Sequence, residues 1–272
     1  MLIAQITDAH VGPAGQLFYD RVDTGAALSA AVAALNAMAP RPDIVLFTGD
    51  LGDKGTAEEY DHIAARLAPL EIPLVVVPGN HDRRGPFRAA FAGNDFLPDG
   101  DGPLHQVIDA FPVRLIGLDT LDEAGTDGSG RIDAAGCAWL EARLAEAPER
   151  PTVVFMHHPP FATGIGHMDA IACRGAEALA EVIARHPQVE RVLCGHVHRP
   201  VTLRWAGTVA SIAPSVAHQV ALELREGRPS AFVLEPPALQ LHLWLPGQGL
   251  VSHTRYIGDH GPAISYATGA PL

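Results

Sequence analysis

The strongest constraint on the fold of this chain is a regular alternation of two patterns from residue 2 to about residue 200. Short runs of apolar, largely β-branched residues are each followed by alanine-rich stretches with helical spacing. Such alternation is typical of βα units that build a largely parallel sheet. The predicted strands are LIAQIT (2–7), DIVLFT (43–48), PLVVV (73–77), VRLIGL (113–118), TVVFM (152–156) and RVLC (191–194).

Capping residues predict where the intervening helices begin. Thr24 is the expected N-cap of an alanine-rich helix, and Thr56 followed three residues later by Glu59 forms a capping-box pattern. Asp133 is expected to cap a further helix. The predicted helices cover residues 24–38, residues 56–70, the stretch after Asp133, and residues 175–186.

The pattern changes after residue 200. Strand-like runs around Trp205 predict a hairpin, and a stretch rich in proline and glycine from about residue 227 predicts a less regular tail. We therefore expect a main domain over residues 1–225 and a small C-terminal extension over residues 226–272. Two roles remain open for the extension, namely a cap on the domain or a contact between copies of the chain.

The charge of the chain limits its partners. Its 272 residues carry 19 basic and 31 acidic side chains, for a formal net charge of −12, and no basic run occurs. Such a chain repels polyanions, so nucleic acid is not an expected partner. The length is sufficient for one large domain with a well-buried core.

Cysteine usage and hydropathy predict the compartment. The three cysteines are odd in number and widely spaced, which fits neither a disulfide framework nor a thiolate zinc site. The first residues lack the basic segment of a signal peptide, and no run of about 18 or more apolar residues occurs. We therefore expect a cytoplasmic protein without a membrane span.

Polar side chains follow five of the predicted strands. A lone histidine after a strand is more often a loop residue than a ligand, but five clusters without basic partners favour a metal site. Ligands lie beyond the carboxyl ends of strands in open α/β sheets, so all five clusters are expected at one place. The clusters are Asp8 and His10; Asp50 and Asp53; Asn80, His81 and Asp82; His157 and His158; and His196 and His198.

The ligand types narrow the choice of metal. Carboxylate, imidazole and amide donors without thiolates favour zinc, manganese, iron or cobalt. Seven candidate ligands are too many for one tetrahedral ion, whereas two divalent ions sharing a bridging carboxylate would use them all. Two such ions beside Asp8 and Asp50 would make the site locally positive, so an anionic phosphodiester could bind to an acidic protein.

The motifs together resemble those of the calcineurin-like metallophosphoesterases. The resemblance rests on D-x-H at Asp8, GD at Asp50, GNHD from Gly79, MHHPP around His157, and GHVH from Gly195, in this order over residues 8 to 198. Within the family it is strongest to the bacterial branch of class III cyclic-nucleotide phosphodiesterases and glycerophosphodiesterases. It implies a four-layer α/β/β/α sandwich of two mixed sheets, and a homo-oligomer.

The resemblance also implies roles for individual residues. Asp50 would bridge the two metals, and His81 would face the substrate rather than a metal. Because His81 directly follows the ligand Asn80 and imidazole has the pKa range of a general acid, His81 is the expected catalytic general acid. Tyr19 and His218 match substrate-lining positions, although by short local matches. One ion would be held by Asp8, His10, Asp50 and His198, and the other by Asp50, Asn80, His157 and His196.

The implied activity is hydrolysis of small phosphodiesters, either 3′,5′-cyclic nucleotides or glycerophosphodiesters, by attack of a metal-bound hydroxide. The same site could serve a phosphomonoesterase or a nuclease, and the absence of basic runs weighs against the nuclease. A non-catalytic binding protein would be expected to have lost ligands, and none of the motif ligands is missing.

Several polar residues near the motifs keep two interpretations. Asp53 and Asp82 could support the metal site or simply form turns. His158 is predicted to be structural, and Cys194 to pack in the core. Surface or packing roles are predicted for His62, His105, His186, His242, His253, His260, Trp205 and Trp244.

Overall fold

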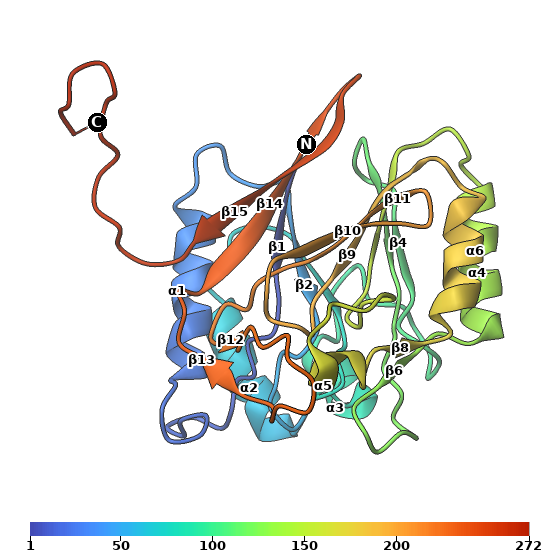
Figure 1. The fold of residues 1–272 in the computed structure, drawn as a ribbon, viewed down its shortest axis with the longest axis horizontal. Coiled ribbons are helices and arrows are strands. Elements are labelled where there is room, and N and C mark those ends of the chain that lie inside the picture. Colours follow the sequence, from blue (N-terminus) through green and yellow to red (C-terminus); the bar gives the residue numbers. More distant parts are fainter. Residues whose placement is uncertain (272) are drawn as a thin grey trace.

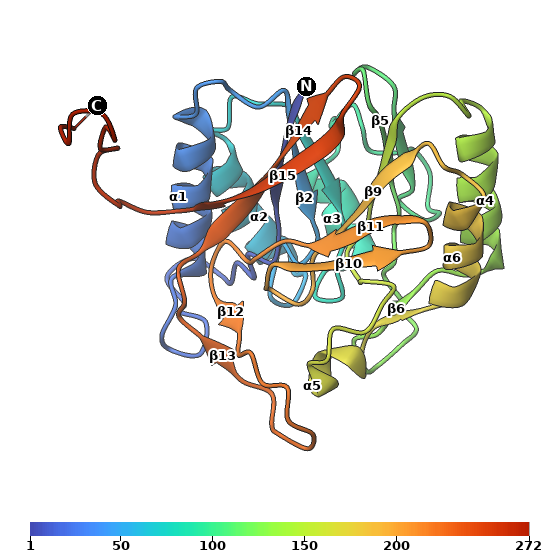
Figure 2. The same cartoon turned by 45° about the horizontal axis from the view of Figure 1, so that its top comes forward.

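In a computed structural model that describes residues 1–271, the chain forms two sheets flanked by helices (Figures 1 and 2). The first sheet has the strand order β15-β14-β1-β2-β3 and the second β10-β11-β9-β7-β5-β4. The strands of the first sheet are β1 (Leu2–Ile6), β2 (Ile44–Thr48), β3 (Leu74–Val77), β14 (Ala238–Leu245) and β15 (Gly249–Tyr256). Those of the second are β4 (Gln106–Ile108), β5 (Arg114–Gly117), β7 (Thr152–Phe155), β9 (Val189–Cys194), β10 (Val201–Trp205) and β11 (Thr208–Ile212).

The helices lie on the outer faces of the sheets. Helices α1 (Thr24–Asn36) and α2 (Ala57–Leu67) flank the first sheet, and α4 (Ala134–Ala145) and α6 (Ala176–Ala184) flank the second (Figure 1). The shorter elements are α3 (Arg84–Ala90), α5 (Gly166–Asp169), and the two-stranded ribbons β6 (Gly130–Arg131) with β8 (Cys173–Arg174) and β12 (Gln219–Val220) with β13 (Phe232–Val233).

Strand β2 shows how the sequence specifies these layers. Ile44 and Leu46 belong to the apolar cluster between the two sheets, whereas Val45 and Phe47 belong to the cluster under α1 and α2. This alternation follows from the two-residue period of a strand whose two faces are both covered. A third cluster joins the second sheet to α4 and α6. The arrangement confirms an α/β fold with two mixed sheets and is consistent with four layers.

The structure confirms most helix starts and corrects one. Thr56 and Glu59 form a reciprocal capping box, and Asp133 caps α4. The prediction that Thr24 caps α1 is wrong, because the Asp23 carboxylate accepts the Ala26 N–H at 2.8 Å. Asp is an equally good capping residue and stands one position earlier.

The expected irregular tail is wrong for residues 238–256. Leu243 of β14 pairs with Leu2 of β1, so the C-terminal strands β14 and β15 extend the first sheet. Residues on both sides of the expected boundary at residue 225 therefore belong to the same sheet. The predicted hairpin is confirmed, since Trp205 pairs with Thr208. Among the described residues no helix is long and apolar enough to cross a membrane.

Candidate metal centre

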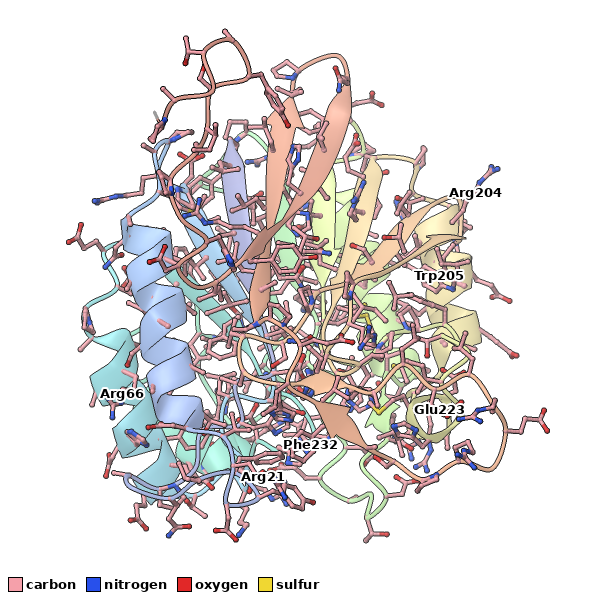
Figure 3. All side chains as sticks on the ribbon, turned by 60° about the vertical axis from the view of Figure 1, so that its left-hand side comes forward. Arg21, Arg66, Arg204, Trp205, Glu223 and Phe232 are labelled. Atoms are coloured by element: carbon pink, nitrogen blue, oxygen red, sulfur yellow. The ribbon has the colours of Figure 1, made fainter. Side chains whose placement is uncertain are left out.

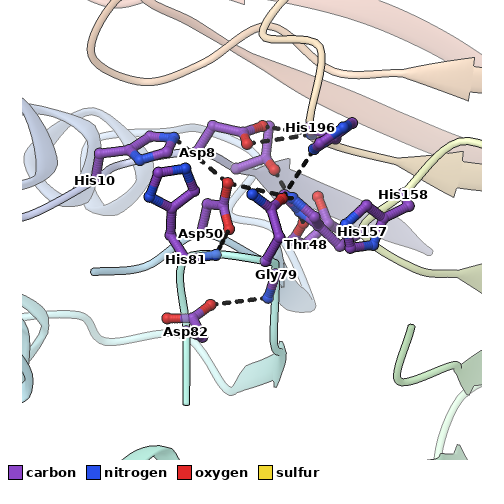
Figure 4. Close-up of polar contacts among 12 residues, drawn as sticks. Asp8, His10, Thr48, Asp50, Gly79, His81, Asp82, His157, His158 and His196 are labelled. Carbon is purple, nitrogen blue, oxygen red and sulfur yellow. Dashed lines mark hydrogen bonds and ion pairs between the residues drawn. The ribbon is translucent and has the colours of Figure 1, made fainter. Parts of the chain in front are cut away.

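The carboxyl ends of β1, β2, β3, β7 and β9 bring the five predicted clusters to one edge of the sheets (Figure 4). Ligand atoms lie within 4.8 Å of one another in a group formed by Asp8, His10 and His198, and in another formed by Asp8, Asp50 and His157. The sequence-predicted convergence of these side chains is therefore present in the fold.

The backbone at these strand ends is strained. Five of the predicted ligands have left-handed φ angles between 46° and 74°, which non-glycine residues rarely adopt. Strain of this kind persists only where the surrounding structure enforces it, and it concentrates at functional sites. The five residues are Asp8, His10, Asp50, His196 and His198.

Two glycines allow the strand ends to approach closely. A Cβ atom on Gly79 would lie 2.1 Å from the Asp50 carboxylate, and one on Gly49 would lie 2.3 Å from the His157 ring. No side chain fits at these distances, so both positions require glycine. The GNHD glycine therefore makes room for Asp50.

On one side of the centre, two imidazoles face each other. The Nε2 atoms of His10 and His198 are 3.0 Å apart, and His198 Nε2 is 3.3 Å from Asp8. His198 Nδ1 donates to the His218 carbonyl at 2.9 Å, which leaves the lone pair of His198 on Nε2. His10 Nε2 is also 3.5 Å from Asp50.

On the other side, two imidazoles, a carboxylate and an amide oxygen meet at short distances. His157 Nδ1 donates to the Thr48 carbonyl at 2.7 Å, so its Nε2 points inward, 3.3 Å from Asp50 Oδ2 and 3.1 Å from Asn80 Oδ1. Asn80 Oδ1 is also 3.0 Å from His196 Nδ1, and the buried Nε2 of His196 has no hydrogen-bond partner.

This donor set fits divalent cations. Imidazole lone pairs, carboxylates and an amide oxygen converge in a buried space, and the hydrogen bonds to backbone carbonyls fix which ring nitrogen points inward. Such outer contacts orient metal-ligating histidines. Buried carboxylates and lone pairs require a donor or a cation, and divalent ions would supply the positive charge here.

The pKa values indicate that the centre stabilises positive charge. Burial alone would lower the pKa of His157, but the Asp50 and Asp8 carboxylates outweigh it and raise this pKa to about 9. Burial would raise the pKa of Asp50, yet His157 and His81 hold it well below its usual value. At His196, burial and the neighbouring His157 lower the pKa to about 3, so this ring is neutral and available as a ligand.

His81 lies at the rim of the centre, with its side chain 39% exposed. Its backbone N–H donates to Asp50 at 2.9 Å, and its Nδ1 donates to the Asp53 carbonyl at 2.7 Å. The Asp53 carboxylate is 3.9 Å from His81 Nδ1 and 4.0 Å from His10 Nδ1. Asp53 thus contacts two histidines of the site besides forming its turn.

Asp82 connects two of the ligand-bearing loops. It is fully buried and accepts hydrogen bonds from the Gly79 N–H at 2.8 Å, the Gly52 N–H at 3.3 Å and the Tyr60 hydroxyl at 2.7 Å. Both interpretations left open by the sequence therefore apply, because Asp82 closes its own turn and also holds the loop after β2.

A cavity of about 790 Å³ opens beside the centre. Tyr19 and His218 line it as expected, and so do Phe18 and Phe232, which the sequence did not identify. Phe18 stacks on His218 at a ring-centroid distance of 4.4 Å, and Phe232 lies 5.3 Å from His218. Figure 3 shows Phe232 and the lining residue Arg21 at the same end of the molecule.

A second cavity, of about 360 Å³, shares His10, His81 and Tyr19 with the first. Lys54, the only lysine of the chain, lines it together with Asp53. Phosphate-sized groups at the centre would therefore have space on two sides.

The remaining histidines fall largely into packing positions. His242 is fully buried and hydrogen-bonds to Gln5 and Ser252, and His105 stacks on Trp139. His158 Nδ1 forms a hydrogen bond with the Thr120 hydroxyl at 2.9 Å. A ligand atom of His158 also lies within 4.8 Å of those of His157 and His196, so its structural role stays a prediction. Cys194 is fully buried in the core, as predicted.

Comparison with known proteins agrees with this geometry. The sequence profile of the calcineurin-like phosphoesterases matches residues 1–200. A probable glycerophosphodiester phosphodiesterase, GpdQ of Arcobacter nitrofigilis, is 39% identical over 98% of this chain and 97% of its own. A probable cyclic nucleotide phosphodiesterase of Rhodopseudomonas palustris is 37% identical over 97% of this chain and 96% of its own.

The fold also resembles solved structures at low identity. A dimetal phosphatase from Danio rerio superposes with a TM-score of 0.63 at 15% identity, over 95% of this chain and 99% of its own. At this identity the likeness concerns the fold alone.

Proposed function

Because this chain belongs to the calcineurin-like phosphoesterase family, we propose that it is a metal-dependent phosphodiesterase that hydrolyses small phosphodiesters at two divalent ions. The observation that carries this proposal is the convergence of seven side chains with metal-binding atoms in one largely buried place. The relatives named as glycerophosphodiester and cyclic nucleotide phosphodiesterases support small diesters as substrates.

We assign the ions to two groups of side chains that share Asp50. The first group is Asp8, His10, Asp50 and His198, and the second is Asp50, Asn80, His157 and His196. The distances of 3.5 Å from Asp50 to His10 and 3.3 Å from Asp50 to His157 support its role as the shared carboxylate. The donor types suit iron, manganese, zinc or cobalt.

When bound, two such ions acidify a water molecule and offset the negative charge of the phosphodiester. The chain itself supplies orientation and a proton. His81 is held by Asp50 and by the Asp53 carbonyl, which leaves its Nε2 free for the leaving alcohol. The Asp53 carboxylate lies 3.9 Å from Nδ1 and faces the same side of the ring as the Asp53 carbonyl.

Two cavities meeting at His10 and His81 support a diester over a monoester, because a diester carries two organic groups. Cyclic nucleotides and glycerophosphodiesters both satisfy this condition, and the choice between them stays open. A phosphomonoesterase is the alternative that the same metal site could serve.

The test is a panel assay with manganese on bis(p-nitrophenyl) phosphate, p-nitrophenyl phosphate, cyclic AMP and glycerophosphoethanolamine. We expect faster turnover of the diesters, and loss of both activity and metal in Asp50→Asn. Asp61→Asn, an exposed acidic residue of α2, is the matched control and should behave as wild type. Faster turnover of the monoester would overturn the assignment, and a metal-loaded but inactive wild type would favour a non-catalytic protein.

We also propose a homo-oligomer. The edge strand β15 exposes its later residues, including Thr254 and Tyr256, and unpaired strand edges favour association. Light scattering coupled to size-exclusion chromatography tests this, and a monomer at micromolar concentration would contradict it.

A further inference from the structure

Gln5 is a polar residue in the apolar layer between the two sheets. On β1 it follows Ile3 by two positions, so both side chains point into this layer, and both are fully buried. Ile3 belongs to the inter-sheet apolar cluster. A buried amide in such a layer is costly unless every hydrogen-bonding group is satisfied.

The amide of Gln5 is satisfied from both sheets. Its Nε2 donates to the Thr48 hydroxyl of β2 at 2.9 Å and to the Cys194 carbonyl of β9 at 2.9 Å. Its Oε1 lies 3.1 Å from Nε2 of His242 on β14. One side chain thus links β2 of the first sheet, β9 of the second sheet, and β14 of the C-terminal hairpin.

The hydrogen bonds behind His242 have only one consistent direction. Arg191 can only donate, and its Nη1 lies 2.6 Å from the Ser252 hydroxyl. The Cys194 carbonyl can only accept, so Nε2 of Gln5 must face it and Oε1 of Gln5 must face His242. The neutral His242 ring therefore donates through Nε2 to Gln5 and accepts at Nδ1 from the Ser252 hydroxyl at 2.7 Å.

The two groups held by Gln5 belong to residues that adjoin candidate metal ligands. The Thr48 carbonyl accepts the hydrogen bond from His157 Nδ1 at 2.7 Å. Cys194 is followed by Gly195, whose N–H donates to the His157 carbonyl at 2.9 Å, and then by His196. The loops are in close contact here, since a Cβ atom on Gly195 would lie 2.7 Å from the Thr48 carbonyl.

We infer that Gln5 is a positioning residue for the metal centre, which fixes the spacing of the His157 and His196 loops by joining Thr48 to Cys194. His242 acts with it by orienting the amide from β14. The inference rests on the proposed metal function, since the residues positioned are the proposed ligands. Through His242, the C-terminal hairpin of β14 and β15 thus helps to set the geometry of the metal centre, although it supplies none of the proposed ligands.

The decisive variant is Gln5→Met, which keeps the length of the side chain and removes its three hydrogen bonds. Ile3→Val is the matched control, because it also disturbs the inter-sheet layer on the same face of β1, opposite His242, but removes none of these hydrogen bonds. His242→Phe is a second variant that leaves Gln5 in place and removes the hydrogen bonds of His242 to Gln5 and to Ser252. Melting temperature, metal affinity by competition with a chelator, and kcat and KM would be measured for each.

We expect Gln5→Met to weaken binding of at least one ion by about tenfold or more, as loss of contacts behind a metal ligand typically does. Turnover should fall while KM changes little, and His242→Phe should show the same effects more weakly. Ile3→Val should lower the melting temperature without changing metal affinity. A folded Gln5→Met protein with wild-type metal affinity would overturn the inference.

The outcome is separable from that of the proposed function. Metal affinity is measured without a substrate, so an error about the substrate would leave this test intact. If Gln5→Met does not fold, His242→Phe decides, because unchanged metal affinity in that variant would also contradict the inference.

Discussion

The Nε2 atoms of His10 and His198 lie 3.0 Å apart in a buried site. At this distance the two nitrogens must share either a proton or a cation. Burial, His81 and further neighbouring histidines hold the pKa of His10 well below its usual value, so this ring is neutral near neutral pH and available as a metal ligand. We expect metal to raise the melting temperature strongly, because binding to the folded state alone contributes about 2.7 kcal/mol at a hundredfold excess over Kd.

His10→Ala should accordingly lose one of two ions per chain and retain the other on the His157 side. Metal content after dialysis, measured by inductively coupled plasma mass spectrometry, checks this. His253→Ala serves as the control because His253 is exposed and distant in sequence from the motifs. Two ions bound equally tightly in His10→Ala would contradict the assignment of the first group.

His81→Ala should keep both ions but lose turnover by roughly 10²- to 10⁴-fold, the usual contribution of general acid catalysis. The loss should be smaller for bis(p-nitrophenyl) phosphate than for glycerophosphoethanolamine, because p-nitrophenolate departs readily without a proton. Parallel kinetics on the two substrates test this. An equal loss on both would assign His81 to binding rather than to proton transfer.

The candidate ligands could be predicted from sequence because each directly follows an apolar strand, and strand ends of one sheet edge meet in space. Asn80 and His157 are 77 positions apart in the chain, yet their side chains are in contact. Asn80 follows β3 of the first sheet and His157 follows β7 of the second, so a single predicted sheet does not bring them together; the two-sheet arrangement was implied only by the family resemblance.

Other features depended on contacts that no local pattern encodes. The alternation in ALQLHLWL fits a strand, but Pro236 and Pro237 precede it, and its pairing with β1 joins the two ends of the chain. Phe18 and Phe232 meet only after folding, so nothing near either residue indicated a shared cavity. Gln5 did carry a signal, since it is a polar residue at an inward position of an apolar strand.

Phe232→Ala should discriminate between the two substrate classes. If the wall formed by Phe18, Phe232 and His218 stacks a nucleobase, loss of one ring removes about 1–3 kcal/mol of stacking, which corresponds to roughly a 5- to 160-fold rise in KM for cyclic AMP. Turnover of glycerophosphoethanolamine should change little, and Phe232→Tyr should retain wild-type values. Steady-state kinetics on both substrates decide, and equal effects on both would exclude base stacking at this wall.

Asp82→Asn should destabilise the protein by about 2 kcal/mol, because an amide can accept at one atom only while the Gly79 and Gly52 N–H groups are buried. Turnover should fall as well, since Gly79 precedes Asn80. Tyr60→Phe is the comparison, since it removes one hydrogen bond to the same carboxylate and should cost about 1 kcal/mol with turnover preserved. Urea unfolding of both variants checks the order of these losses, and an Asp82→Asn protein as stable as wild type would contradict it.

His242 should make stability depend on pH in the metal-free protein. Burial and, to a lesser extent, Arg191 lower the pKa of His242 to about 3, whereas an unfolded chain has an ordinary histidine pKa of about 6.5. Below pH 6.5 the unfolded state therefore binds more protons than the folded state, so the free energy of unfolding falls as the pH falls. The contribution of this one residue is about 1.4 kcal/mol per pH unit well below pH 6.5.

The comparison of wild type with His242→Gln isolates this contribution, because the centre's other histidines titrate in both proteins. At pH 8 we expect the variant to be less stable by about 1 kcal/mol, the value of a typical hydrogen bond. Between pH 6.5 and pH 5 the difference should shrink and then reverse, because only the wild type must keep this ring neutral. Urea unfolding at a series of pH values measures the difference, and a constant gap across this range would show that His242 binds its proton equally well in the folded and unfolded states.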